Sequence, residues 1–169
     1  KVETLLEKKG SKACFDWLVN KFRNEKKYAE LFEAMLMKKR YELHLPLLPS
    51  GPLNDLPKKQ QQAYDTGAVE AAREVGGCFL EQGDITKAWP YYRAIGEIKP
   101  NYEAIDQLDV SDDQEGVIEI AYNECVHPRK GFELVLQNYG VCRAITCFAQ
   151  YPNSASLEES ALLLTRTVY

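Results

Sequence analysis

Residues 69–102 read VEAAREVGGCFLEQGDITKAWPYYRAIGEIKPNY and decide the fold of this 169-residue chain. Apolar residues recur at helical spacing on both sides of a Gly83-Asp84 turn, which predicts two helices. Gly76 falls on the first helix and Ala88 on the second, and their small side chains allow the helices to approach closely. The stretch therefore predicts an antiparallel helical hairpin.

The rest of the chain is patterned for helices as well. Apolar residues follow a helical period, and alternating patterns of useful length for a strand are missing. We expect Gly10-Ser11 to separate the first two helices and Pro128 to occupy the first turn of a later one. The expected helices span residues 2–9, 11–23, 26–42, 59–82, 85–99, 112–126, 129–150 and 156–169, with a further short turn at 101–108. This pattern predicts an all-α fold.

Residues 43–58 interrupt the helical pattern. They hold prolines that prevent a helix from continuing, and also leucines that a plain polar linker would not contain. The prolines are Pro46, Pro49, Pro52 and Pro57, and the leucines are Leu43, Leu45, Leu47, Leu48, Leu53 and Leu56. We expect an extended Pro/Leu-rich arm that lies across the helices and buries part of these side chains. The alternative is that the arm is itself a docking surface.

The pattern within residues 69–102 resembles the tetratricopeptide repeat, a helical hairpin built on small and aromatic residues and closed by a proline. The matching residues are Val75, Gly76, Phe79, Ala88, Tyr92 and Pro100. Ala72 stands where the family has a bulky residue, and Pro90 falls inside the second helix, where we expect it to kink the axis. The resemblance covers one repeat and implies helical hairpins stacked as a short solenoid.

The same resemblance implies a surface for partners. Repeats of this kind bind extended peptides or helices on the face that their first helix lines. In this chain that face carries Glu70, Arg73 and Glu81, which would orient a partner, and Leu80, which would supply apolar area. We therefore predict these four residues as partner-binding. The competing interpretation is that the arm of residues 43–58 fills this face.

The predicted domain organisation is a single all-helical domain spanning residues 1–169. Hairpins at 11–42 and 112–150 accompany the one at 69–102, and three hairpins are the usual minimum for a stack. The last helix, 156–169, ends within an apolar pattern, which favours an oligomer contact or a partner helix further along the chain. We therefore expect the sequence to be a fragment of a longer protein.

Charge is distributed unevenly along the chain. Residues 1–59 carry 13 Lys/Arg and 8 Asp/Glu, whereas residues 60–169 carry 8 and 17. The best basic cluster, Lys38-Lys39-Arg40, is equally typical of a solvated helix end, and duplex nucleic acid usually needs a denser basic stripe. This favours a protein or peptide partner, with nucleic-acid binding through the basic N-terminal third as an alternative.

The cellular compartment is predicted from what the sequence lacks. No run approaches the ~20 apolar residues of a membrane helix, so no membrane association is expected. The 5 cysteines are odd in number and irregularly spaced, which favours reduced thiols over a disulfide framework. We expect a cytoplasmic protein.

Cys125 and His127 are the only local candidates for chemistry. A Cys-x-His pair supplies two zinc ligands or a nucleophile and a base, but a structural zinc site takes four ligands and a nucleophile also needs an orienting group. The competing interpretation is that His127 caps the helix that Pro128 begins. We expect no enzyme activity, no metal and no cofactor, with an enzyme or metal-binding domain centred on Cys125 and His127 as the alternative.

These observations together predict a non-catalytic protein-interaction or scaffolding module. Its partner would bury apolar side chains on a helical-repeat surface and would be oriented by the charges of that surface. The sequence identifies neither the partner nor the pathway.

Overall fold

The computed structural model describes residues 2–48, 56–109, 115–149, 161–162 and 165–166. Within these ranges the backbone is helical or forms turns and bends, and no strand occurs. The all-α fold class is thereby confirmed. No helix in these ranges combines the length and the apolar character that crossing a membrane requires.

The chain divides into two compact units, Lys1–Gln82 and Gly83–Tyr169, where the sequence had predicted one domain. The boundary falls in the predicted Gly83-Asp84 turn, so the two halves of the tetratricopeptide-like hairpin at 69–102 belong to different units. We refer to Lys1–Gln82 as unit 1 and to Gly83–Tyr169 as unit 2.

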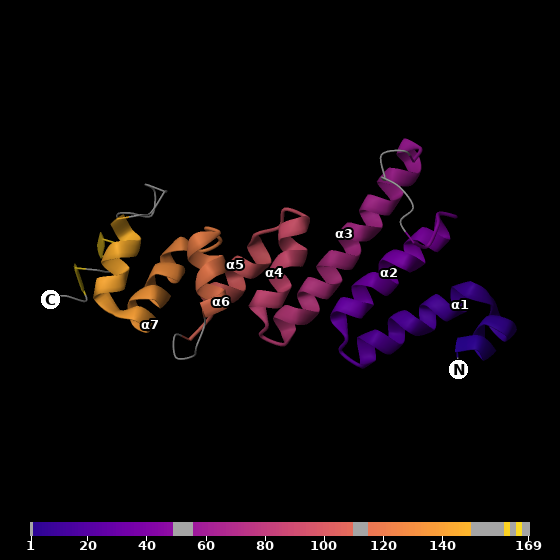
Figure 1. The fold of residues 1–169 in the computed structure, drawn as a ribbon, viewed down its shortest axis with the longest axis horizontal. Coiled ribbons are helices and arrows are strands. Elements are labelled where there is room, and N and C mark those ends of the chain that lie inside the picture. Colours follow the sequence, from indigo (N-terminus) through magenta and orange to yellow (C-terminus); the bar gives the residue numbers. More distant parts are fainter. Residues whose placement is uncertain (1, 49–55, 110–114, 150–160, 163–164, 167–169) are drawn as a thin grey trace. The chain divides into compact units, whose positions relative to one another are not determined.

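Unit 1 contains three helices, α1 (Val2–Asn24), α2 (Tyr28–Glu42) and α3 (Lys58–Glu81). Figure 1 shows α2 running antiparallel to α1 and then α3 running antiparallel to α2, and α2 packs against both of its neighbours. Leu31 and Ala34 of α2 are almost fully buried. The ring of Tyr28 meets the ring of Phe79 edge-on at 5.2 Å, which ties the start of α2 to the end of α3.

The predicted break at Gly10-Ser11 is wrong. α1 continues through both residues as one helix from Val2 to Asn24. A single glycine inside a helix costs only about 1 kcal/mol relative to alanine, which is too little to end a helix by itself.

The described ends of the arm are held by side chains of α2 and α3. The buried side chain of Arg40 donates a hydrogen bond from Nε to the Pro46 carbonyl at 2.6 Å, and its guanidinium lies over the Tyr64 ring at 5.6 Å. Gln60 donates to the Leu43 carbonyl at 3.3 Å. Among the described leucines of the arm, Leu43, Leu45 and Leu56 are half-buried and Leu47 and Leu48 are exposed. Leu53 lies outside the described residues.

Unit 2 begins with two short helices, α4 (Ile85–Ala94) and α5 (Lys99–Asp106). The Asp84 carboxylate caps α4 by accepting the backbone N–H of Lys87 at 3.1 Å, as a residue at this position should. The buried Asn101 amide of α5 donates to the Ile85 carbonyl at 3.2 Å and so links the two helices.

The predicted helix at 85–99 is too long. α4 stops at Ala94 because Gly96 adopts a φ of 72°, which closes the helix end, and Pro90 lies inside α4 as expected. Pro100 does not close this segment but lies in the first turn of α5, where its missing N–H costs nothing. The short turn expected at 101–108 is therefore a helix that begins earlier.

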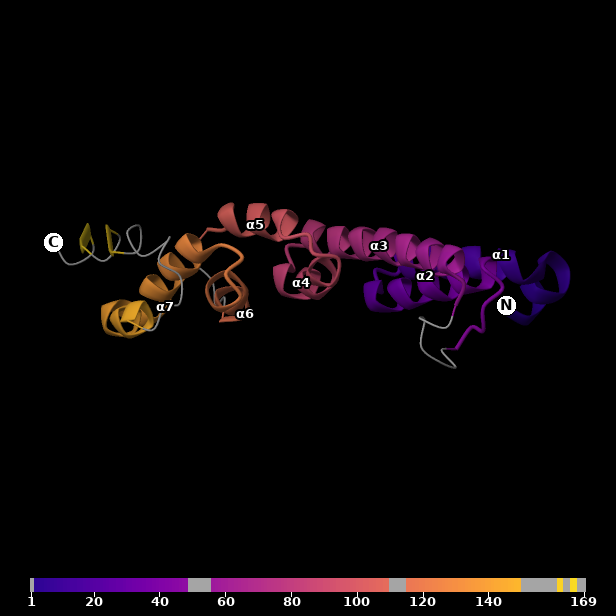
Figure 2. The same ribbon diagram turned by 90° about the horizontal axis from the view of Figure 1, so that it is seen from above.

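The rest of unit 2 consists of α6 (Glu115–Ile118), the π-helical turn η2 (Glu119–Asn123) and α7 (Pro128–Ala149). Figure 2 shows the same chain turned by 90°. α7 begins at Pro128 as predicted, and it packs against α6 and η2. Its fully buried Phe132 and Leu134 form a core with Ile118 and Tyr122.

The expected uninterrupted helix at 129–150 is wrong. Gly140 has φ 77° and ψ 176°, a non-helical conformation essentially reserved for glycine, so α7 consists of two helical segments joined at this residue. Tyr139 and Cys142, which flank this residue, are exposed. Cys125 is exposed in the turn after η2. The predicted helix at 156–169 falls mainly outside the described residues.

Three helices end in the same hydrogen-bonded motif. After α1, α2 and α4, a residue with positive φ donates to the carbonyl three residues back, and the next residue donates to the carbonyl five back. The positive-φ residues are Lys26, His44 and Gly96. This is the Schellman motif, which favours glycine because a side chain strains the left-handed conformation.

Candidate functional site

The four predicted partner-binding residues lie on α3, and one of them, Glu70, lines a groove formed by described residues. Glu70 lines a groove of unit 1, whereas Arg73 and Glu81 are exposed and Leu80 is half-buried. This difference follows from the helical period, because Glu70 lies about one turn from Gly67 and about one turn from Glu74, which also line the groove, and so shares their side of α3.

The groove, called the α3 groove below, has a volume of about 300 Å³ and is formed by all three helices of unit 1. Its lining residues are Val19, Arg23, Met35, Lys38, Lys39, Glu42, Gly67, Glu70 and Glu74. Val19 and Met35 give it an apolar part, and the remaining side chains are charged apart from Gly67. A groove of this composition suits a partner that presents both an apolar and a charged side chain.

Two ion pairs connect the helices around the α3 groove. Arg23 of α1 reaches Glu74 of α3, with Nε at 2.8 Å and Nη2 at 2.5 Å from Oε1. Lys38 of α2 lies 2.6 Å from the carboxylate of Asp16 on α1, and this hydrogen bond lowers the pKa of Asp16. These pairs hold the wall of the groove in place. The four charged groups that form them already have partners, so they are less available to bind another molecule.

Three charged residues of the α3 groove form no ion pair within the described residues. They are Lys39, Glu42 and Glu70. The alkyl stem of Lys39 lies directly over Gly67. Because Glu42 and Glu70 form no ion pair within the described residues, their carboxylates are available to a partner's basic group.

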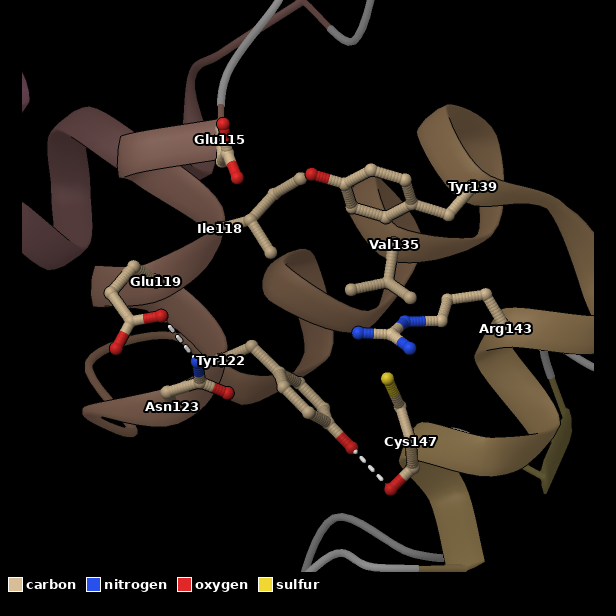
Figure 3. A pocket seen from close by; sticks show the side chains of 9 residues that line it. All are labelled: Glu115, Ile118, Glu119, Tyr122, Asn123, Val135, Tyr139, Arg143 and Cys147. Atoms are coloured by element: carbon tan, nitrogen blue, oxygen red, sulfur yellow. Dashed lines mark hydrogen bonds between the residues drawn. The ribbon is translucent and has the colours of Figure 1, made fainter.

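Unit 2 has a hollow of about 340 Å³ between α6–η2 and α7, called the Arg143 hollow below (Figure 3). Ile118, Tyr122 and Val135, all buried, form its floor on the core of the unit. Tyr139 and Arg143 rise from α7 on one side, and the opposite side carries acidic and amide side chains of α6 and η2. The full lining is Glu115, Ile118, Glu119, Tyr122, Asn123, Val135, Tyr139, Arg143 and Cys147.

The break at Gly140 shapes this hollow. It turns the second segment of α7 so that Arg143 and Cys147 face α6 and η2, and the Tyr122 hydroxyl donates to the Cys147 carbonyl at 2.9 Å. The π-helical turn that carries Tyr122 is a feature often found at functional sites. If α7 were straight, the segment that carries Arg143 would continue in the direction of the first segment, and this hollow would not form.

The charges of the Arg143 hollow are only partly satisfied internally. Glu119 accepts a hydrogen bond from the Asn123 amide. Within the described residues Arg143 and Glu115 have no ion pair or hydrogen bond, and Figure 3 shows the Arg143 guanidinium pointing toward the middle of the hollow. A cation without a partner in the described part of the chain thus faces an apolar floor.

His127 caps the start of α7, which is the second of the two interpretations that the sequence offers for this residue. The Lys130 backbone N–H donates to Nδ1 at 3.3 Å, so Nε2 carries the ring proton and donates to Asp106 at 3.0 Å. The ring is buried and stacks on Tyr102 with centroids 4.1 Å apart. The Cys125 thiol lies 3.6 Å from the Tyr122 carbonyl, and both nitrogens of His127 already have partners. The described residues therefore give Cys125 no free base, and no group of three potential metal ligands occurs among them.

The basic cluster Lys38-Lys39-Arg40 is divided by the structure. Lys38 is paired with Asp16, and Arg40 is buried against Tyr64. Only Lys39 retains an unpaired charge within the described residues. One cation does not supply the continuous basic stripe that binds phosphates.

Comparison of the chain with protein-family models, with curated proteins and with solved structures finds no match. The functional argument therefore depends on the two hollows. Sequence reasoning found Glu70 but missed Arg143, because it treated 129–150 as one straight helix. The signal that was available is Gly140, which interrupts an otherwise apolar helical pattern three residues before Arg143.

Proposed function

We propose that the chain is a non-catalytic, cytoplasmic protein-interaction module of tetratricopeptide-like helical hairpins that binds a peptide segment of its partner in the α3 groove. The observation that carries the proposal is Glu70, which has no ion pair among the described residues and lies in a groove whose helices are linked by two ion pairs. Such pre-organisation reduces the entropy that a binding surface loses when a partner docks.

The chemistry of the α3 groove selects the partner. Val19 and Met35 offer contact to an apolar side chain, and methionine adapts to side chains of different shape. Glu42 and Glu70 form no ion pair within the described residues, and their carboxylates attract a basic side chain. The preferred segment accordingly combines an apolar residue with a nearby Lys or Arg.

A peptide array tests this function. The full chain is applied to peptides in which an apolar residue is followed, at varied spacing, by Lys, Arg, Asp, Glu or Ser. Peptides with a basic residue are expected to bind best, and Glu70→Arg is expected to weaken them by about tenfold or more, the range of a charge-assisted hydrogen bond.

Asp65→Arg is the matched control, because it makes the same charge change on an exposed residue of α3 outside the groove lining. It should leave binding within about twofold of the unmodified chain, since exposed charges outside a contact are largely screened. If no basic peptide binds, or if both variants weaken binding equally, the proposed function is wrong.

A further inference from the structure

We infer that the Arg143 hollow of unit 2 is a separate binding site for a small organic monocarboxylate with an apolar, preferably aromatic, body. The inference does not depend on the α3 groove, which lies in unit 1.

The hollow has the size and the floor of a ligand site. Its volume of about 340 Å³ falls at the lower end of the range for small-molecule pockets. The floor is built from the buried side chains of Ile118, Tyr122 and Val135, and the Tyr139 ring stands beside it, about half exposed at 48%. A ring placed here covers apolar surface that water now covers, which favours binding.

Arg143 supplies the charge recognition. Its guanidinium points into the hollow and has no ion pair or hydrogen bond within the described residues. A planar guanidinium matches a carboxylate with two parallel hydrogen bonds, and such charge-assisted bonds are the strong ones. The anionic group of the ligand therefore lies at the α7 side of the hollow.

The opposite side limits the ligand to one carboxylate. Glu115 and Glu119 line the hollow from α6 and η2, across from Arg143 (Figure 3). A second carboxylate on the ligand would face these two acidic side chains and be repelled. The hollow therefore distinguishes a monocarboxylate from a dicarboxylate of similar size, and either from a neutral amide.

The test is a titration of the ¹⁵N-labelled full chain followed by NMR, with three probes that share a phenyl ring. 3-Phenylpropanoate is expected to bind saturably with a millimolar Kd, as befits its size, and to shift the amides of Ile118, Tyr122 and Arg143 most. 3-Phenylpropanamide and phenylsuccinate are expected to bind at least about tenfold more weakly, because one lacks the charge and the other adds a repelled one.

Two variants assign the effect to the guanidinium. Arg143→Gln is expected to weaken 3-phenylpropanoate by about tenfold or more, whereas Arg129→Gln, an exposed arginine of the same helix outside the hollow, leaves it unchanged. Circular dichroism is used to check that both variants keep the helical content of the unmodified chain. The inference is overturned if 3-phenylpropanoate gives no saturable shifts, if the amide binds as well as the acid, or if Arg143→Gln binds like the unmodified chain.

Discussion

The two units of this protein bring their helices together in different ways. In unit 1, the three atoms nearest to a Cβ at Gly67, a glycine at a helix contact, all belong to the flexible stem of Lys39. In unit 2, Gly131 of α7 faces backbone, and a Cβ at this position would lie 2.7 Å from the Tyr122 nitrogen and 2.9 Å from the Ala121 carbonyl carbon. A side chain can move aside and a packed backbone cannot, so the same residue type is replaceable in one unit and required in the other.

The largest expected difference in stability comes from replacing each of these two glycines by alanine. Gly131→Ala should destabilise unit 2 by about 3 kcal/mol, because η2 and α7 must separate. Gly67→Ala should change the stability of unit 1 by no more than about 0.5 kcal/mol, since the better helix propensity of alanine compensates for moving Lys39.

The two tryptophans allow each unit to be followed separately, because Trp17 lies in unit 1 and Trp89 in unit 2. Urea unfolding of Gly131→Ala is measured by Trp89 fluorescence in a Trp17→Phe background. Gly67→Ala is measured by Trp17 fluorescence in a Trp89→Phe background. Equal losses in the two units would contradict the distinction between them.

Gly140 sharpens the comparison within unit 2, because it is required for its own backbone conformation and has open space around it. Gly140→Ala should cost about 2 kcal/mol through strain alone. Trp89-monitored unfolding checks the value. A loss as small as that of Gly67→Ala would mean that the two segments of α7 form one straight helix.

His127 tests whether the first turn of α7 depends on its cap. His127→Ala should destabilise unit 2 by about 1–2 kcal/mol, since it leaves the Lys130 N–H unpaired and removes the bond to Asp106. His127→Asn should recover part of this loss, because asparagine is a good capping residue but lacks the imidazole that stacks on Tyr102. If alanine and asparagine behave alike in urea unfolding, the cap contributes nothing.

Lys26 offers a gain in stability in unit 1. Because it adopts a φ of 55° at the end of α1, Lys26→Gly should stabilise the unit by about 1 kcal/mol. Lys27→Gly is the control, since the φ of Lys27 is −91° and glycine relieves no strain there. The prediction fails if Trp17-monitored unfolding shows the two variants to be equally stable.

The smallest expected effect is the pH dependence of the α4 cap. Burial acts to raise the pKa of Asp84, but the hydrogen bonds and the charge of Lys87 outweigh it, and the pKa is lowered. A depressed pKa gives stability that is present above the unfolded value near 3.8 and is lost as the pH falls through the folded value. Asp84→Asn keeps a capping side chain that does not titrate. As the pH falls from 6 to 3, the variant should therefore lose less stability to urea unfolding than the unmodified chain does. An unchanged difference would contradict the assignment.

The sequence was sufficient for those features that depend on local pattern. It predicted the all-α class, the positions of α2 and α3 to within a few residues, the Gly83-Asp84 turn and one role of His127. These features are set by helical periodicity and by single hydrogen bonds near in sequence.

Features that depend on contacts distant in sequence, or on the geometry of one backbone residue, were missed. Gly10 resembles a helix end but lies within α1, whereas Gly140 resembles a helix interior but divides α7. The Arg143 hollow depends on the break of α7 at Gly140, so no sequence motif predicts it. The residues Glu70, Arg73, Leu80 and Glu81 share one helix, but it is three-dimensional packing that places Glu70, and not the other three, in the lining of the α3 groove.

The most direct test of the proposed function is a map of amide shifts when the best basic peptide from the array binds the ¹⁵N-labelled full chain. The account predicts that the largest shifts occur at Val19, Met35 and Glu70, and that Arg143→Gln leaves them unchanged. Shifts concentrated in unit 2, or a peptide that binds without moving the amides of the α3 groove, would contradict it.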